Sequence, residues 1–418
     1  MTKSLINSFF DLYNQMKEMI KKYDKIILPV LFVYALFINP ISQISIFSYF
    51  DELFTFIFAF YCLMNVKEVF RYKRIICYAW ILFLVIGLIS SIIFQYQGIF
   101  AVLMDSFAIN SKFIIVYLAC YLYFIKNKAN VKNEIINCAK VIIIVLAFIT
   151  VHDLIFNPIF PKAEFRYFMY SYRLMFSHPT YLAAAMSTLL ILFGFDNKDN
   201  KNIAYMIIAS IIGVFTFRLK AVAFIAFYWI VYIVVFILKK EKLLIQTIIV
   251  GVISSFVIAK DAIEGYFLVS AGKFSPRSIM LNDSIKLASN HFPLGTGFGS
   301  FGTTIADKFY SPLYYELGYQ NFWGMGPENS MFLTDCFWPA VIAQTGYVGL
   351  IIFATVLLNL LMYCFKTFKI NKMNGLSMLM ILAYLCITST AESSFFNPTS
   401  FLFFMLFALF EVDSILNN

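Results

Sequence analysis

Apolar stretches of about 20 residues recur along most of this chain, and they constrain its fold more than any other feature. Because an α-helix rises about 1.5 Å per residue, such a stretch spans the roughly 30 Å hydrocarbon core of a bilayer. Of the 418 residues, 61% are hydrophobic and 13% are charged, and the mean hydropathy is +0.81. A water-soluble domain cannot be built from that mixture. The sequence therefore predicts an all-α integral membrane protein, with one polytopic membrane domain over residues 1–418.

Twelve candidate spans fit this pattern. Residues 203–238 are interrupted only by Arg218 and Lys220, and as one helix they would be about 54 Å long. Since that length far exceeds a bilayer core, we expect a helical hairpin with both charges at its tip. Residues 1–25 carry apolar side chains at helical spacing opposite several lysines, which predicts an amphipathic cytoplasmic segment on the inner leaflet. The expected spans are 26–46, 48–64, 75–94, 101–125, 135–156, 178–195, 203–217, 221–238, 243–260, 338–364, 375–391 and 395–410.

The distribution of charged residues between the predicted segments indicates the orientation of the chain independently of hydropathy. With the N-terminus inside, the inner segments hold 21 of the 32 basic residues and ten of the 23 acidic residues. Cytoplasmic segments of membrane proteins collect lysine and arginine, so we expect both termini in the cytoplasm. The formal charge of +9 then reflects orientation in the membrane, and the expected partners include membrane lipids and no nucleic acid.

One predicted outer segment is much longer than the others. It covers residues 261–337, between spans 9 and 10, and holds nine of the 17 glycines and 15 aromatic residues. A second, shorter outer segment covers residues 157–177. Glycine and aromatic residues suit irregular backbone packed against a membrane or a ligand, so function is expected in these two segments.

Arginine and histidine are concentrated on the predicted outer side, against the usual trend. All three histidines and four of the six arginines lie there, whereas lysine supplies nearly all of the inner charge. A guanidinium group is a planar, permanently charged fork that binds phosphate or carboxylate in a bidentate manner. Four arginines on one side therefore favour an anionic ligand. They are Arg166, Arg173, Arg218 and Arg277, and the histidines are His152, His178 and His291.

Within the long segment, Ser275-Pro276 predicts the start of a helix that runs to about Asn290. At 100° per residue, Arg277 and His291 would lie on one face of this helix, about 21 Å apart along its axis. The two side chains could then line one site without touching.

Several other kinds of site are not supported. The glycine-rich run 294–302 follows no strand and belongs to no βαβ unit, so it does not predict a nucleotide site. Neither HExxH spacing nor a cluster of cysteine and histidine is present, so no metal or other cofactor is expected. Of the seven cysteines, only Cys336 lies near the outer surface, which predicts packing rather than a disulfide framework.

The motifs around the long segment resemble the O-antigen and capsular polysaccharide polymerase family (Wzy-type), which is related to the O-antigen ligases. The resemblance is strongest over about 170–350. The motifs that carry it are Arg173-Leu174-Met175-Phe176-Ser177-His178-Pro179, Phe217-Arg218-Leu219-Lys220, Arg277, Phe292-Pro293-Leu294-Gly295-Thr296-Gly297-Phe298-Gly299, Glu328-Asn329-Ser330, Asp335 and Gln344-Thr345-Gly346-Tyr347-Val348-Gly349-Leu350.

This resemblance implies a glycosyltransferase at the outer face of the bacterial plasma (inner) membrane. Such an enzyme joins oligosaccharide repeat units carried on undecaprenyl diphosphate and releases undecaprenyl diphosphate. The implied partners are undecaprenyl-diphosphate-linked oligosaccharides, with a flippase and a chain-length regulator as candidate protein partners. Arg173, Arg218 and Arg277 would stabilise the diphosphate charge. The residue that accepts the acceptor hydroxyl's proton is left unassigned among Glu328, Asp335, His178 and His291.

Two alternative functions remain open from the sequence. The ligases usually carry a histidine where Glu328 stands, which disfavours a ligase that moves the finished glycan to another acceptor. A flippase or transporter would be expected to bury ionisable residues near the bilayer midplane and to show two related halves. The sequence shows no such repeat, and its unusual charges concentrate at the predicted outer boundary.

Overall fold

The computed structural model describes residues 22–47, 49–128, 131–156, 158–167, 169–195, 201–240, 246 and 275–417. It is mostly helical, and the described ranges contain one small antiparallel sheet of β1 (Phe165–Arg166) and β2 (Met169–Tyr170). An all-α fold therefore fits. The α-helices are α2 (Asp24–Leu36), α3 (Ile38–Ser42), α4 (Phe50–Met64), α5 (Val66–Phe94), α6 (Ile99–Leu103), α7 (Lys112–Asn127), α8 (Lys132–Ile155), α9 (Pro179–Phe195), α10 (Ile203–Val214), α11 (Leu219–Tyr232), α14 (Pro276–Asn290), α15 (Thr304–Lys308), α16 (Pro312–Glu316), α17 (Phe337–Ile370), α18 (Lys372–Thr388) and α19 (Ser400–Leu416). Shorter 3-10 or π segments are η1 (Ser45–Phe47), η2 (Met104–Asn110), η4 (Ile233–Ile237) and η6 (Tyr319–Asn321).

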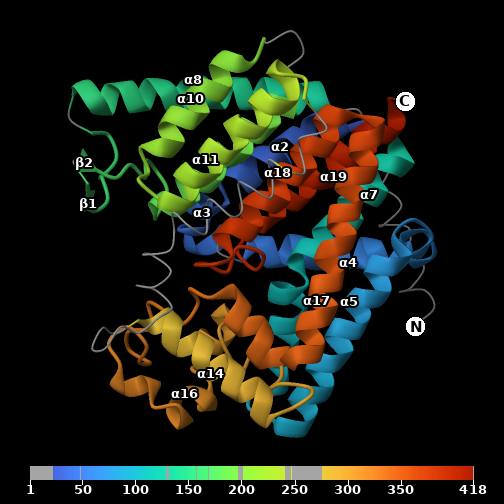
Figure 1. Ribbon diagram of the computed structural model, residues 1–418, viewed down its shortest axis with the longest axis vertical. Helices are drawn as coiled ribbons and strands as arrows, with labels where there is room; N and C mark the ends of the chain where they lie inside the picture. The colour runs from blue at the N-terminus through green and yellow to red at the C-terminus, as the bar shows by residue number, and fades with distance from the viewer. Residues whose placement is uncertain are drawn as a thin grey trace.

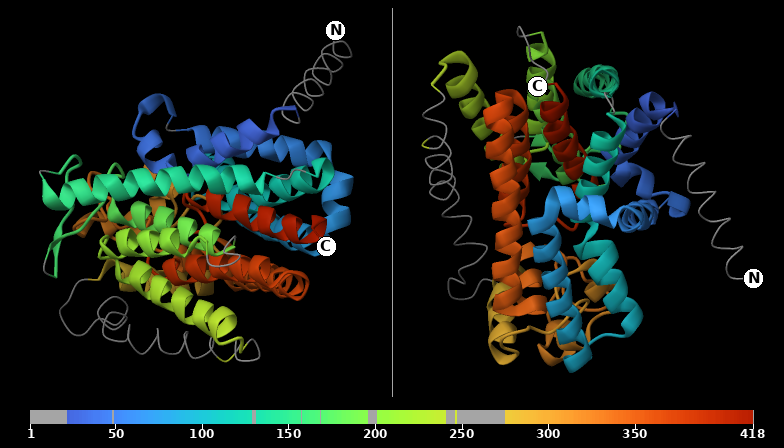
Figure 2. Two further views of the ribbon diagram at one scale, coloured as in Figure 1. Left: turned by 90° about the horizontal axis from the view of Figure 1, so that it is seen from above. Right: turned by 90° about the vertical axis from the view of Figure 1, so that its right-hand side faces the viewer.

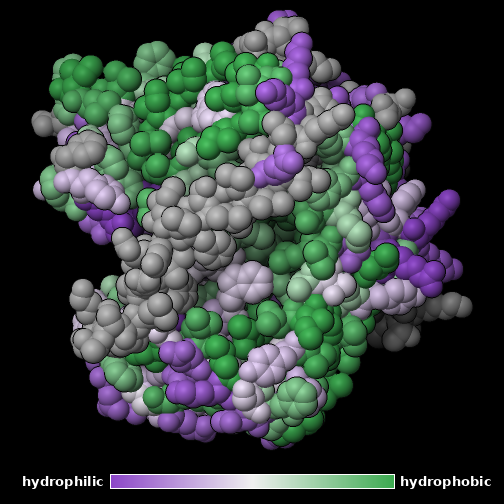
Figure 3. Space-filling model, viewed as in Figure 1, coloured by the Kyte–Doolittle hydropathy of each residue, from purple (hydrophilic) through white to green (hydrophobic). Residues whose placement is uncertain are grey.

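Long helices pack side by side into a bundle, with a lobe at one end (Figure 1). Helices α5 and α17 lie against each other and extend from the bundle to the lobe, which contains α14 and α16. Seen from above, α8 runs along the bundle and contacts α2 and α10 (Figure 2). Apolar residues cover much of the bundle, whereas polar side chains gather on the lobe and beneath the β-hairpin (Figure 3).

Several helices could cross a bilayer. Five helical stretches in the described ranges are long and apolar enough: Ser45–Met64, Val66–Phe94, Lys132–Ile155, Leu219–Ile237 and Phe337–Ile370. This is consistent with a membrane protein, but twelve spans and the side on which each loop lies stay predictions. Three further apolar helices are shorter, namely Pro179–Gly194, Ile203–Val214 and Lys372–Thr388. The predicted span 243–260 lies almost entirely outside the described residues. The predicted amphipathic segment 1–25 lies mostly outside them.

The span expected over 101–125 is bent in the structure. Residues Ile99–Asn110 and Lys112–Asn127 form two helices bent by 51°, which would count as a sixth span only if the bent pair crosses as one. The first helix ends in the π-helix η2, where Asn110 Nδ2 donates to the backbone oxygen of Asp105 at 2.9 Å. The hydroxyl of Ser111 likewise donates to the backbone oxygen of Ser106 at 2.7 Å. These side chains satisfy carbonyl groups that a regular helix would pair internally, which explains the bend.

The hairpin expected around Arg218 is present. Helix α10 ends at Val214 and α11 begins at Leu219, and the two helices contact each other. Between them, Phe217 has a positive φ of 47° and Arg218 has extended backbone, so the helix cannot continue through these residues.

The described part of the long segment, 275–336, is a packed lobe rather than an irregular loop. Its helix α14 covers Pro276–Asn290, as Ser275-Pro276 predicted. The glycine-rich run joins the lobe to the bundle, because Gly297 lies so close to α5 that a Cβ atom there would be 2.6 Å from Ser91 Cα. The amide of Phe298 donates to Ser91 Oγ at 2.8 Å, and that of Gly299 donates to Asp105 Oδ2 at 2.8 Å. This run therefore packs closely against the bundle.

Among the described residues, two ion pairs are buried inside the bundle, and the sequence did not reveal them. Lys73, expected in a polar inner segment, instead points inward from α5 to Glu411 of α19 at 2.5 Å. Its ammonium also lies 3.9 Å from the ring centre of Tyr121. Lys112 of α7 pairs with Asp51 of α4. Both pairs join helices that are distant in sequence, and all four side chains are at most 8% exposed.

Candidate functional site

The first part of the site is built around Arg218, at the start of α11. Its guanidinium NH2 donates to Glu164 Oε1 at 2.6 Å and lies 2.9 Å from His178 Nε2. Glu164 also pairs with Arg166 at 3.1 Å. The arginine side chain is only 12% exposed, whereas that of Glu164 is 51% exposed. The mostly buried guanidinium of Arg218 is therefore paired with a carboxylate that is half exposed at the surface.

Arg173 shapes the loop that carries His178. Its Nε donates to the backbone oxygen of Pro161 at 2.9 Å, and its NH1 donates to that of Ser177 at 2.9 Å. Ser177 is in turn held by Asn39, whose Oδ1 accepts from the Ser177 amide at 2.9 Å. Arg173 thus fixes the segment before α9 through its backbone contacts.

The second part of the site joins the lobe to the turn between α18 and α19. Arg277 NH2 donates to Asp335 Oδ2 at 2.9 Å and lies 3.4 Å from the backbone oxygen of Ala391. Next to Ala391, Glu392 pairs through Oε1 with Lys220 Nζ at 3.4 Å. Lys220 lies in the first turn of α11, two positions after Arg218, so α11 connects the two parts.

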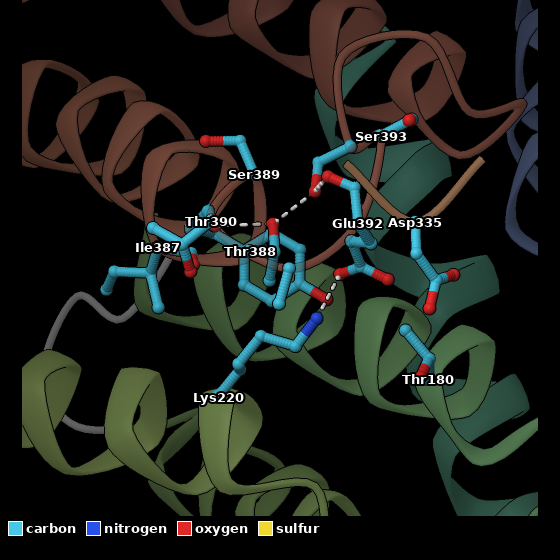
Figure 4. A network of polar contacts seen from close by, with 12 residues as sticks. Thr180, Lys220, Asp335, Ile387, Thr388, Ser389, Thr390, Glu392 and Ser393 are labelled. Atoms are coloured by element: carbon cyan, nitrogen blue, oxygen red, sulfur yellow. Dashed lines mark hydrogen bonds and ion pairs between the residues drawn. The ribbon is translucent and has the colours of Figure 1, made fainter. Parts of the chain in front are cut away.

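Serine and threonine side chains fix that turn in place (Figure 4). The hydroxyl of Ser394 donates to Thr388 Oγ1 at 2.7 Å, within the turn. The hydroxyl of Ser393 donates to the backbone oxygen of Thr334 at 2.8 Å, and Thr334 directly precedes Asp335 in the lobe. These bonds hold Glu392 near Asp335 although the two residues belong to different elements.

Burial and neighbouring charge set the protonation of the site. Burial raises the pKa of Glu392 despite the nearby ammonium of Lys220, and it raises the pKa of Asp335 despite the guanidinium of Arg277. Burial and the positive charge of Arg218 lower the pKa of His178 to about 4, so its imidazole is neutral at pH 7. Among the described residues, five cations and three carboxylates meet here, so the cations are in excess by two. The cations are Arg166, Arg173, Arg218, Lys220 and Arg277, and the carboxylates are Glu164, Asp335 and Glu392.

The structure brings five of the seven residues predicted for the site to this region: Arg173, Arg218, Arg277, His178 and Asp335. His291 does not join them. Its Nδ1 lies 2.8 Å from the backbone oxygen of Leu287 and its Nε2 lies 3.0 Å from Tyr96 Oη, at the opposite end of α14 from Arg277. The expectation that one helix face would direct both residues to one site was therefore wrong, since His291 follows the last helical residue and turns toward Tyr96.

Glu328 also lies apart. Its side chain is exposed on a tight turn closed by Gly326 and Asn329, and within the described ranges it forms no ion pair with the site. Arg166 belongs to none of the motifs that carry the family resemblance, but its pair with Glu164 joins it to Arg218.

Sequence reasoning did not assign four residues of the site, namely Glu164, Arg166, Lys220 and Glu392. Glu392 carried a usable signal, because it is a lone carboxylate in a serine- and threonine-rich turn between two apolar helices. Its partner Lys220 could not be inferred, since no local pattern relates α11 to that turn.

No model of a known protein family matches this chain, and no curated protein matches it either. The site's geometry and the motif resemblance therefore carry the functional argument.

Proposed function

We propose that this chain is a polysaccharide polymerase of the Wzy type. It joins oligosaccharide repeat units linked to undecaprenyl diphosphate at the outer face of the bacterial plasma membrane and releases undecaprenyl diphosphate. One observation supports this most. Arg218, Lys220 and Arg277 each pair with a carboxylate, and these pairs lie beside apolar helices that could lie in a bilayer.

The chemistry of the site suits a lipid diphosphate leaving group. Negative charge develops on the diphosphate as its bond to the sugar breaks, and preorganised guanidinium groups stabilise such charge best where water is scarce. Arg218 and Arg277 are at most 20% exposed, so their positive charges are only partly screened by solvent. The surplus of two positive charges complements a diphosphate, and the neighbouring apolar helices could hold its hydrocarbon tail.

A flippase or transporter is the second candidate, because the bundle buries two ion pairs. In each pair, however, the lysine ammonium contacts the carboxylate of its partner directly, so the two charges neutralise each other. The surplus charge instead gathers where the loops and helix ends meet, which favours chemistry on a charged headgroup.

The test is to disrupt the gene in its host and to compare the lengths of surface glycan. Polymerase activity predicts that cells without the protein carry single repeat units on their surface or on the lipid carrier, and that the restored gene returns the ladder of longer chains. A flippase predicts that lipid-linked repeats accumulate on the cytoplasmic side. A ligase predicts that long chains still form but stay on the lipid carrier. Either of these last two results would contradict the proposal.

A further inference from the structure

Polymerisation requires a group that accepts the proton of the attacking hydroxyl, and two of the candidates are poorly placed for this. Both ring nitrogens of His291 lie within hydrogen-bond distance of Leu287 and Tyr96, away from the arginines. Glu328 is exposed to solvent on its own turn. A general base must lie within hydrogen-bond reach of the reacting hydroxyl, directly or through one water. A hydroxyl beside the diphosphate-binding arginines would be out of reach of both.

The other two candidates lie in the site but are already engaged. Arg218 can only donate, so the contact at 2.9 Å uses the lone pair of His178 Nε2, which is the atom a base needs. With its pKa lowered to about 4, this imidazole is also a weak base. Asp335 accepts a charge-assisted hydrogen bond from Arg277 at 2.9 Å, which occupies one of its two carboxylate oxygens.

We propose that Glu392 is the catalytic base, which accepts the proton from the acceptor hydroxyl. This inference rests on the proposed polymerase function. Glu392 lies between the two cationic parts of the site, near Lys220 of α11 and Asp335 of the lobe (Figure 4). Its only ion pair within the described residues is the contact with Lys220, at 3.4 Å, which is longer than a charge-assisted hydrogen bond. The carboxylate is 16% exposed, so it is shielded yet keeps an open edge.

The groups around Glu392 fit this role. The ammonium of Lys220 lies 3.4 Å from the carboxylate and favours its ionised form, and the turn from Thr388 to Ser394 fixes its position. Burial raises its pKa above the usual value, which strengthens it as a base at neutral pH. Several titratable and charged groups interact electrostatically with Glu392. They are Lys220 and Arg218 at the start of α11, Arg277 of α14, Asp335 of the lobe, Tyr181 of α9 and Tyr384 of α18.

The proposed step balances. The hydroxyl oxygen of the acceptor sugar forms a bond to the anomeric carbon of the donor while its proton moves to a Glu392 carboxylate oxygen. The bond from the anomeric carbon to the phosphate oxygen breaks, and undecaprenyl diphosphate leaves with that electron pair. The protonated Glu392 then returns its proton to solvent.

The test uses the full-length protein in liposomes of phosphatidylethanolamine and phosphatidylglycerol. The probe is the lipid-linked repeat unit extracted from host cells that lack the gene. Glu392→Gln removes the basic oxygen but keeps the shape, and should lower kcat by about 10² to 10⁴-fold with little change in KM. Glu316→Gln is the matched control on the exposed end of α16 and should act as the wild type. Each variant is checked for membrane level and thermal stability.

The pH profile separates a base from a merely structural carboxylate. The wild-type rate should fall as pH decreases through the raised pKa of Glu392, because the protonated carboxyl cannot accept a proton. Glu392→Asp keeps a carboxylate, and this acidic limb should persist but move to lower pH.

Two results would overturn the assignment without contradicting the polymerase function. One is an acidic limb that lies at the same pH in Glu392→Asp as in the wild type. The other is a Glu392→Gln rate within about threefold of the wild-type rate. If the wild-type protein forms no glycan, the proposed function fails and this inference fails with it.

Discussion

The role of Arg277 can be tested by removing its charge with and without its partner. Arg277→Ala deletes the guanidinium that donates to Asp335 at 2.9 Å. A charge-assisted hydrogen bond contributes about 1.5 to 3 kcal/mol, so losing one that acts on the leaving diphosphate should slow turnover by roughly tenfold to a hundredfold. Arg277→Lys keeps the charge without the planar fork and should recover only part of that loss.

The same substitution also strips Asp335 of its partner, which would lower activity even if Arg277 never touched a ligand. The double variant Arg277→Ala with Asp335→Asn separates these causes, because it leaves no unpaired carboxylate. Arg277 and Asp335 are 20% and 33% exposed, so the unpaired carboxylate should cost about 1 to 3 kcal/mol of stability, which the double variant should return.

The assay is the glycan ladder in cells lacking the native gene, with the membrane level of each variant measured. Lys286→Ala is the control on the same helix, since Lys286 is 70% exposed and pairs with Asp283. We expect the double variant to be stable and still to make short chains. If it restores full-length glycan, Arg277 serves only to neutralise Asp335, and the proposed diphosphate contact is refuted.

Two further predictions follow from single contacts, and a third follows from the distribution of lysine. Glu164→Gln should tighten binding of undecaprenyl diphosphate, measured by tryptophan fluorescence in detergent, because the carboxylate no longer competes for Arg218; unchanged or weaker binding would contradict this. Lys73→Met should lower the free energy of unfolding by about 3 to 5 kcal/mol by leaving Glu411 buried and unpaired, and Lys73→Met with Glu411→Gln should be less destabilised in a thermal scan. A reporter fused after Lys240 should be cytoplasmic and one inserted near Tyr319 external, so labelling of both from one side would disprove the predicted topology.

Local sequence signals predicted local structure well. Ser275-Pro276 gave the start of α14, because proline is favoured in the first turn of a helix, where its missing amide has no helical partner. The charges of Arg218 and Lys220 located the break between α10 and α11, because apolar residues continued for longer than one span. Grouping arginines with the predicted outer side also anticipated that Arg173, Arg218 and Arg277 would lie in one region.

Features that depend on distant partners could not be predicted. Lys73 was assigned to a polar inner segment, since nothing near it in sequence shows that Glu411, 338 positions away, lies opposite it. The bend at Ser111 arises from polar side chains that replace regular helical bonds, and hydropathy alone does not detect it. Glu392 lies in the site because Ser393 and Arg277 tie its turn to the lobe and Lys220 pairs with its carboxylate.

If the proposed function is right, this chain alone joins lipid-linked repeat units, and reconstitution can show whether it does. The purified protein in liposomes is given lipid-linked repeat units extracted from host cells that lack the gene, with no other protein present. The glycans are resolved by length and the released undecaprenyl diphosphate is counted. We predict a ladder of products, with one undecaprenyl diphosphate released for each new linkage. Repeat units that cross the bilayer without any linkage forming would contradict the account and identify a transporter instead.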